Sequence, residues 1–144
     1  MTTLNMRGFE DALDAYVHKA PSIPYPTKQF LVKYGGYIAL IIGILEIFNS
    51  GILSVLNLGI KPLWLNNEIF SGTYYLYLVF ECLVGIMLIL AFRPLNAKNV
   101  KGWRYALYAS FLFFLVSLAG GDIGGIITTV IAIYLLFQVR QQYY

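Results

Sequence analysis

Charged residues are almost absent from four long stretches of this sequence, and no other feature limits the fold as strongly. Residues 34–60 contain one charge, Glu46, and residues 69–92 contain one charge, Glu81. A helix needs about 20 predominantly apolar residues to cross the hydrocarbon core of a bilayer. Both stretches are long enough to do so, and each therefore predicts a membrane-spanning helix.

Two further stretches of 17 residues, 105–121 and 123–139, are uncharged and flank Asp122. At about 1.5 Å per residue, each just covers about 25 Å of hydrocarbon. The alternative is one hairpin over residues 105–139 that enters the membrane without crossing it. We favour two crossings, because a glycine-rich turn with a carboxylate belongs at a water interface. The predicted spans are residues 34–55, 74–92, 105–121 and 123–139.

The composition favours a membrane protein over a water-soluble domain. Hydrophobic residues make up 59% of the 144 residues, which gives more apolar surface than a soluble domain of this length can bury. We therefore predict an all-α, multi-pass integral membrane protein, a four-transmembrane-helix bundle with the lipid bilayer around it. The sequence does not distinguish a bacterial inner membrane from a eukaryotic endomembrane.

Several classes of function lack their sequence signals. The net charge of +3 is too small to indicate a nucleic-acid partner. The single cysteine, Cys82, allows no internal disulfide and no cysteine-based zinc cluster, and the single histidine, His18, lies outside the predicted spans. No nucleophile elbow and no glycine-rich phosphate loop occurs. We expect no cofactor, no metal and no enzymatic activity.

The orientation follows from the basic residues that flank the spans, because these residues stay on the cytoplasmic side. Lys61 is the one basic residue in the connection between the first two spans, which also carries Trp64. The other side carries Lys28, Lys33, Arg93, Lys98, Lys101, Arg104 and Arg140. We therefore predict that both termini lie in the cytoplasm.

The amino-terminal residues 1–20 have the apolar spacing of a short amphipathic helix, with Phe9, Leu13 and Tyr16 on one face and the acidic residues elsewhere around it. The polar side is acidic, whereas helices that lie on a membrane surface usually have a basic polar side. We therefore expect the apolar face to dock on a partner or on the protein's own cytoplasmic loop. Lying on the lipid surface and disorder are the alternatives.

Three prolines at positions 21, 24 and 26 predict a stiff, extended spacer over residues 21–29. The spacer separates the amino-terminal helix from the four-helix transmembrane domain, which we assign to residues 30–144.

Glu46 and Glu81 lie inside predicted spans, where an isolated charged carboxylate costs at least about 2.5–3.5 kcal/mol. Counted from the nearest cytoplasmic basic residue, both lie roughly 18–20 Å from the boundary. The same count gives Ser117 and the threonines at positions 128 and 129 a similar depth on the last two helices. The predicted polar layer consists of Glu46, Glu81, Asn49, Ser50, Ser117 and Thr128.

Small residues mark the faces that pack inside the bundle, because they let helix backbones approach closely. On the first predicted helix they recur every four residues and the stripe continues to Glu46, which places that glutamate toward protein. On the second, a glycine lies one turn from Glu81. The predicted helix-packing residues are Gly35, Ala39, Gly43, Gly85, Gly121 and Gly125.

Two functions fit these features. The first is a small accessory, scaffold or assembly subunit that acts through helix packing and its amino-terminal helix, with other membrane-protein subunits or itself as partner. Protonated glutamates would then serve only as hydrogen-bonding links between helices. The alternative is a proton- or cation-coupled small transporter or channel, in which Glu46 and Glu81 change charge and the neighbouring oxygens contact a ligand.

Overall fold

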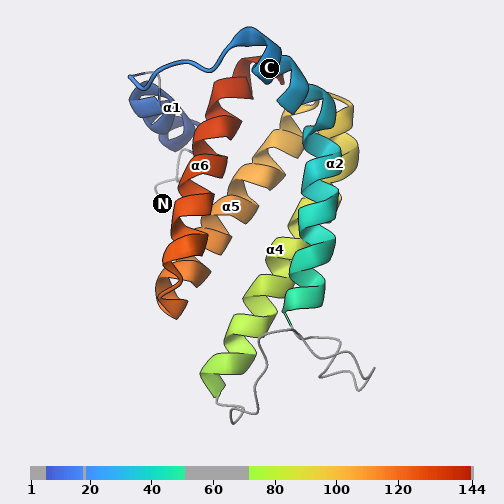
Figure 1. Ribbon diagram of the computed structural model, residues 1–144, viewed down its shortest axis with the longest axis vertical. Coiled ribbons are helices and arrows are strands. Elements are labelled where there is room, and N and C mark those ends of the chain that lie inside the picture. The colour runs from blue at the N-terminus through green and yellow to red at the C-terminus, as the bar shows by residue number, and fades with distance from the viewer. Residues whose placement is uncertain (1–5, 18, 51–71, 144) are drawn as a thin grey trace, which may run out of the picture.

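The computed structural model describes residues 6–17, 19–50 and 72–143, and every regular element in these residues is a helix (Figure 1). The elements are α1 (Met6–Val17), α2 (Tyr25–Asn49), α4 (Gly72–Asn96), α5 (Val100–Gly120), α6 (Ile123–Val139) and the 3-10 turn η1 (Arg140–Gln142).

Four stretches of helix are long and apolar enough to cross a membrane, and they are Tyr25–Asn49, Leu76–Asn96, Val100–Gly120 and Ile123–Gln142. The predicted all-α fold of four spans preceded by a short helix is therefore confirmed. The last residues of the first predicted span, 51–55, and the connection with Lys61 and Trp64 lie outside the described residues.

The proline-rich spacer is shorter than predicted, because α2 begins at Tyr25, inside the range 21–29. Pro24 is the N-cap residue of α2, and Pro26 lies in its first turn. Proline fits there because the first backbone N–H groups of a helix have no partner within it, and its fixed φ already suits the helix. Within the predicted spacer, only residues 21–24 are non-helical.

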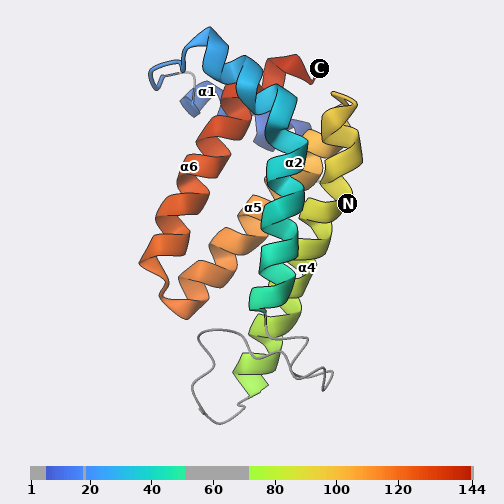
Figure 2. The same cartoon turned by 45° about the vertical axis from the view of Figure 1, so that its right-hand side comes forward.

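The spans pack in chain order, α2 on α4, α4 on α5 and α5 on α6, whereas α2 and α6 have few direct contacts (Figure 2). Gly43 of α2 and Gly85 of α4 mark a close approach of the two helices. A Cβ atom at Gly43 would lie 2.7 Å from the carbonyl oxygen of Gly85, so a side chain there requires the helices to separate. The bundle is therefore tight between α2 and α4 and open between α2 and α6.

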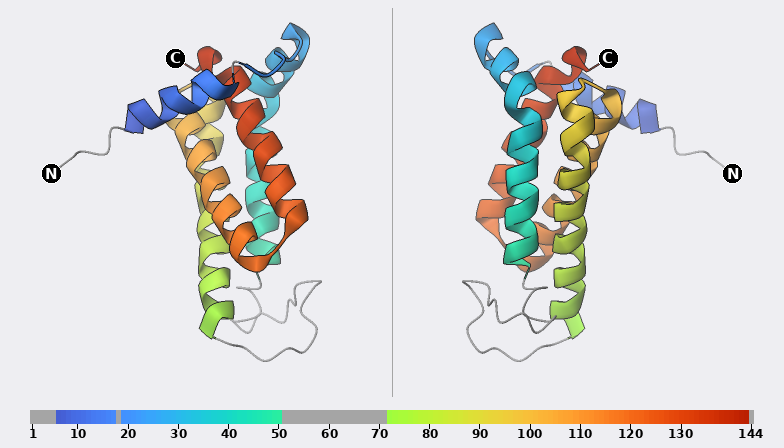
Figure 3. Two further views of the ribbon diagram at one scale, coloured as in Figure 1. Left: turned by 90° about the vertical axis from the view of Figure 1, so that its left-hand side faces the viewer. Right: turned by 90° about the vertical axis from the view of Figure 1, so that its right-hand side faces the viewer.

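The amino-terminal helix and the carboxyl terminus lie at the same end of the bundle, and α1 lies across that end beside α5 and α6 (Figure 3). The non-helical segment that follows α1 passes over the end of α6 to reach α2. It is attached there by the Tyr134 hydroxyl, which donates a hydrogen bond to the carbonyl oxygen of Pro21. The orientation of this end toward the cytoplasm stays a prediction.

The hydrophobic core is densest at this same end. Trp103 and Leu107 of α5 and Ala91 of α4 are completely buried, and the Trp103 ring meets Phe137 of α6 edge to face at 5.4 Å. The Trp103 indole N–H donates to the Leu136 carbonyl oxygen at 2.7 Å. This end therefore holds α5 and α6 in a fixed relation.

Candidate functional site

A cavity of about 330 Å³ lies between α2 and the pair α5 and α6, with part of α4 in its wall. We call it the lateral cavity. Its wall is largely apolar and includes Ile38, Ile42, Leu88, Phe113, Leu136 and Val139. The cavity opens at the protein surface, because three of its wall residues have exposed side chains. These are Ile38 and Ile42 on α2 and Thr128 on α6. The opening lies between α2 and α6.

Glu46 is the carboxyl group in the wall of the lateral cavity. Its Oε2 atom is buried and has no hydrogen-bond partner in the part of the chain that the structure describes. Burial of an unpaired charge is costly in an apolar site, so this carboxyl group needs either a proton or a nearby cation.

The structure brings Glu81 close to Glu46, near enough for the two carboxyl groups to interact electrostatically. Glu81 is only 2% exposed and lies behind the wall. It accepts a hydrogen bond from the Tyr77 hydroxyl one turn earlier on α4, while its Oε2 atom has no hydrogen-bond partner among the described residues. The two glutamates predicted as a pair are therefore neighbours, and they differ in their access to the cavity.

The other members of the predicted polar layer differ in position. Ser50 and Ser117 are buried, whereas Asn49 and Thr128 are exposed. The Ser50 hydroxyl donates to the Ile47 carbonyl oxygen, and the Thr128 hydroxyl donates to that of Gly124, both at 2.8 Å. Their protons are therefore used within their own helices. Any ligand beside them would find hydroxyl oxygens that accept hydrogen bonds.

The predicted helix-packing residues fall into three groups, two of which involve α2. Gly43 and Gly85 meet each other between α2 and α4, whereas Gly35 and Ala39 lie in the wall of the lateral cavity. A Cβ atom at Gly35 would meet only the Tyr143 hydroxyl, at 3.6 Å. Internal packing therefore does not require a glycine at this position.

At the opposite end of the last two helices, the two remaining glycines of the predicted packing set belong to the turn. Gly121 ends α5 in the left-handed conformation, with φ of 69°. A Cβ atom at Gly125 would collide with the side chains of Ser117 and Asp122. The pattern of small residues at this end serves the turn between α5 and α6.

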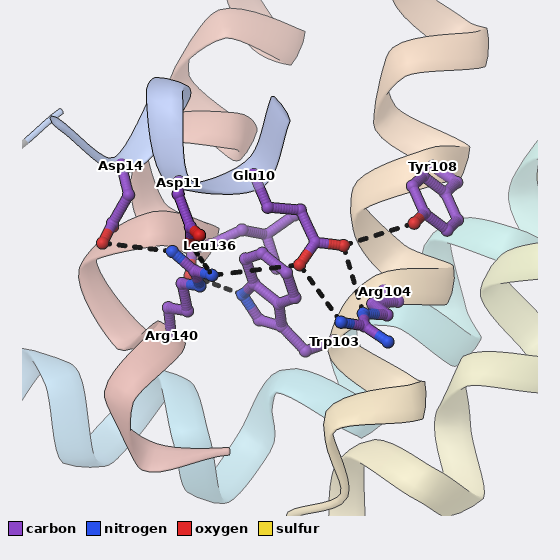
Figure 4. Close-up of polar contacts among 8 residues, drawn as sticks. All are labelled: Glu10, Asp11, Asp14, Trp103, Arg104, Tyr108, Leu136 and Arg140. Carbon is purple, nitrogen blue, oxygen red and sulfur yellow. Dashed lines mark hydrogen bonds and ion pairs between the residues drawn. The ribbon is translucent and has the colours of Figure 1, made fainter. Parts of the chain in front are cut away.

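A second polar site, which sequence reasoning missed, attaches α1 to the bundle (Figure 4). Glu10 is 1% exposed. One carboxylate oxygen, Oε1, lies 3.1 Å from Nε of Arg104 and accepts a hydrogen bond from the Tyr108 hydroxyl at 3.3 Å. The other, Oε2, accepts from Nη2 of Arg104 at 3.3 Å and lies 3.9 Å from Nη2 of Arg140.

Arg140 completes this site from the end of α6. Its Nη2 donates to Oδ1 of Asp11 at 2.8 Å, and its Nη1 lies 3.1 Å from Oδ2 of Asp14. The guanidinium carbon lies 5.6 Å from the centroid of the Trp103 ring, within range of a cation–π contact. We call Glu10, Asp11, Asp14, Arg104, Tyr108 and Arg140 the clamp.

The polar side of α1 therefore also faces the bundle, which the prediction of docking through Phe9, Leu13 and Tyr16 did not include. The physical reason is the pair of arginines at the ends of α5 and α6, which supply the charge that allows Glu10 to be buried. Of the predicted docking residues, Leu13 packs against the core, and the Phe9 ring lies 5.6 Å from that of Phe111. Tyr16 is 72% exposed.

A sequence signal for the clamp does exist. Three acidic residues within one short helix precede a chain whose predicted cytoplasmic side is rich in arginine and lysine, so complementary charge predicts an attachment. The sequence does not specify which basic residues are used. In the structure they are Arg104 and Arg140, two of the residues that also set the predicted topology.

The chain matches no protein-family model, and neither a curated protein nor a solved structure is significantly similar to it. Among the described residues, no three histidine, cysteine or acidic side chains are grouped closely enough to hold a metal ion.

Proposed function

We propose that this protein binds a lipophilic cation in the lateral cavity and exchanges it for a proton at Glu46, as a small coupled carrier. The observation that carries the proposal is the buried, unpartnered Oε2 atom of Glu46 in an otherwise largely apolar wall. The proposal develops the transporter alternative from the sequence, and it gives the two glutamates different roles.

The chemistry of the wall selects the type of ligand. A small inorganic cation needs several oxygen ligands, whereas the lateral cavity offers one carboxyl group, a few hydroxyl oxygens and a large apolar surface. An organic cation uses both parts of such a site, because its apolar body fills the cavity and its charge pairs with the carboxylate. The Phe113 ring in the wall adds a surface that attracts cations.

The protonation state of Glu46 follows from the same cost of burying charge. Without a ligand the Glu46 carboxyl group keeps its proton, because lysine, arginine and histidine are absent from residues 34–60, 69–92 and 105–139. When a cation enters, the carboxyl group releases its proton to water and the carboxylate pairs with the cation. When the cation leaves, a proton returns. Glu81 lies behind the wall, and its charge state influences this exchange without contact with the ligand.

The test is a titration of the purified protein with tetraphenylphosphonium in weakly buffered detergent solution, with binding heat and proton release both measured. Wild type should bind and release protons, and Glu46→Gln should lose at least about tenfold in affinity together with the proton release. Glu81→Gln is the matched control, because it makes the same change behind the wall. It should still release protons on binding. Equal binding by wild type and Glu46→Gln would remove the basis of the proposal.

The accessory or scaffold function remains the second candidate, and one observation favours it. Small residues of both α2 and α6 line the lateral cavity, among them Gly35 and Ala39 on α2 and Ala132 on α6. Small side chains suit the close approach of a helix from another subunit. Gly35→Leu would fill part of this cavity and leave the contact between α2 and α4 unchanged. If co-purifying membrane proteins are lost from this variant while tetraphenylphosphonium has no effect on wild type, the scaffold function is favoured.

A further inference from the structure

We propose that Arg104, Arg140 and Tyr108 form a binding site for a phosphate group, which α1 occupies with its own carboxylates. The site goes beyond the proposed transport function and does not depend on it. In this arrangement α1 is an internal competitor, and a phosphate-bearing molecule at the membrane surface releases it.

The geometry around Glu10 is that of an anion site. Two guanidinium groups and one hydroxyl group converge on a single carboxylate that is 1% exposed. Arginine contacts both carboxylate oxygens here, and the same planar arrangement of donors suits two oxygens of a phosphate group. The unesterified oxygens of a phosphate group carry its negative charge, so the group can engage both arginines as the Glu10 carboxylate does.

The position of the site gives phosphate groups access to it. Arg104 lies at the first turns of α5, and Arg140 follows the last turn of α6, so both guanidinium groups are at the ends of membrane spans. This is the level at which lipid headgroups lie. Arg104 is 30% exposed and Asp11 is 67% exposed, so the boundary between α1 and the bundle is open to the surroundings on one side.

The attachment of α1 is also suited to exchange. Much of it is ionic, and the apolar residues Phe9 and Tyr16 remain 49% and 72% exposed while α1 is attached. When α1 leaves the clamp, these side chains can enter the interfacial region of the bilayer. Release of α1 therefore exchanges one set of favourable contacts for another.

The test measures binding of phosphatidylglycerol by the full chain in dodecyl maltoside micelles, a detergent without a phosphate group. The variant Glu10→Gln/Asp11→Asn/Asp14→Asn removes the competing carboxylates and should bind phosphatidylglycerol more tightly than wild type. The expected gain in affinity is about 30-fold, because each of the two arginines contributes about 1 kcal/mol of attraction to an anionic headgroup. Adding Arg104→Gln/Arg140→Gln to this variant should abolish the gain.

A matched control separates the site from general attraction between charges. Adding Lys98→Gln/Lys101→Gln to the triple variant removes the same charge from exposed positions at the same end of the bundle. The gain should survive in this control. The proposal is overturned if the triple variant shows no gain while its helical circular dichroism matches wild type, or if the lysine and arginine variants lose the gain equally. Glu10→Gln alone should shift binding in the same direction, which covers the case in which the triple variant does not fold.

The source of the phosphate is decided in the same system with inorganic phosphate. Competition by millimolar phosphate for the triple variant supports a site for soluble phosphate compounds, and binding of the lipid without such competition supports a headgroup site. Failure of both ligands to bind the triple variant more tightly than wild type overturns the assignment.

Discussion

The Glu10 carboxylate and the Arg104 guanidinium, 94 positions apart in the chain, meet at 3.1 Å in a site where Glu10 is 1% exposed. Arg140 pairs with Asp11 at a shorter distance, 2.8 Å, but Asp11 is 67% exposed. Burial decides which contact matters more, because water and salt weaken an exposed pair and leave a buried one strong.

We therefore predict that Glu10→Gln loosens α1 far more than Asp11→Asn. Loss of a fully buried ionic partner costs about 3–5 kcal/mol, and the partial exposure of Arg104 reduces this to about 1–3 kcal/mol, against less than about 1 kcal/mol for Asp11→Asn. Hydrogen exchange of the α1 amides measures the difference. Equal loss of protection in the two variants would show that the length of the ion pair, and not its burial, determines the attachment.

The spans were predictable because the cost of charge and of unpaired backbone groups in hydrocarbon is large and local. A gap between charged residues therefore indicates a helix without knowledge of its neighbours. The same reasoning found Glu46 and Glu81. It did not predict that Glu46 lies in a cavity wall while Glu81 is hidden behind it, since this depends on how far α6 stands from α2.

The clamp was less predictable, because the sequence of α1 shows its apolar face but not the partners of its acidic residues. The apolar spacing of Phe9, Leu13 and Tyr16 indicates a docking side, and Leu13 does pack against the core, but Glu10 is more deeply buried than any of these three. Its burial depends on Arg104 and Arg140, which are distant in sequence and come together only when α5 packs on α6. Pairing of this kind has no local sequence signature.

The contact between α2 and α4 predicts opposite effects for two glycines of one helix. Gly43→Ala places a Cβ atom 2.7 Å from the Gly85 carbonyl oxygen and should destabilise the bundle by about 1–3 kcal/mol. Gly35→Ala meets only the Tyr143 hydroxyl at 3.6 Å and should stabilise α2 by up to about 1 kcal/mol through helix propensity. Unfolding in mixed detergent micelles, followed by circular dichroism, compares them. Similar behaviour of the two variants would contradict the close approach at Gly43.

The turn between α5 and α6 allows a test at neighbouring positions. Gly121 has a φ of 69°, which costs a residue with a side chain about 1–2 kcal/mol, whereas Gly120 is helical and its Cβ atom would lie 3.5 Å from the Tyr77 ring. Gly121→Ala should therefore lower the unfolding free energy by about that amount, and Gly120→Ala should change it little. The same unfolding assay applies. An unaffected Gly121→Ala would mean that the turn adopts another conformation.

Tyr143, after the last span, predicts how the bundle end responds to alkaline pH. Burial raises the pKa of Tyr143 above its ordinary value of 10.0, because the ionised phenolate loses hydration. The unfolded chain then ionises first as pH rises, so the stability due to the neutral ring is complete below about pH 10 and is lost as pH climbs toward the raised pKa. The midpoint temperature of thermal unfolding should therefore fall more steeply above pH 10 in wild type than in Tyr143→Phe.

The same residue links this pH response to the lateral cavity, because Tyr143 lies in its wall opposite Gly35. Ionisation of the phenol at this position places a negative charge at the wall and draws water toward it. Cation binding by Tyr143→Phe should therefore match wild type at neutral pH, where both rings are neutral, and the two should diverge only above about pH 10. A difference already present at neutral pH would mean that the hydroxyl group itself contacts the ligand.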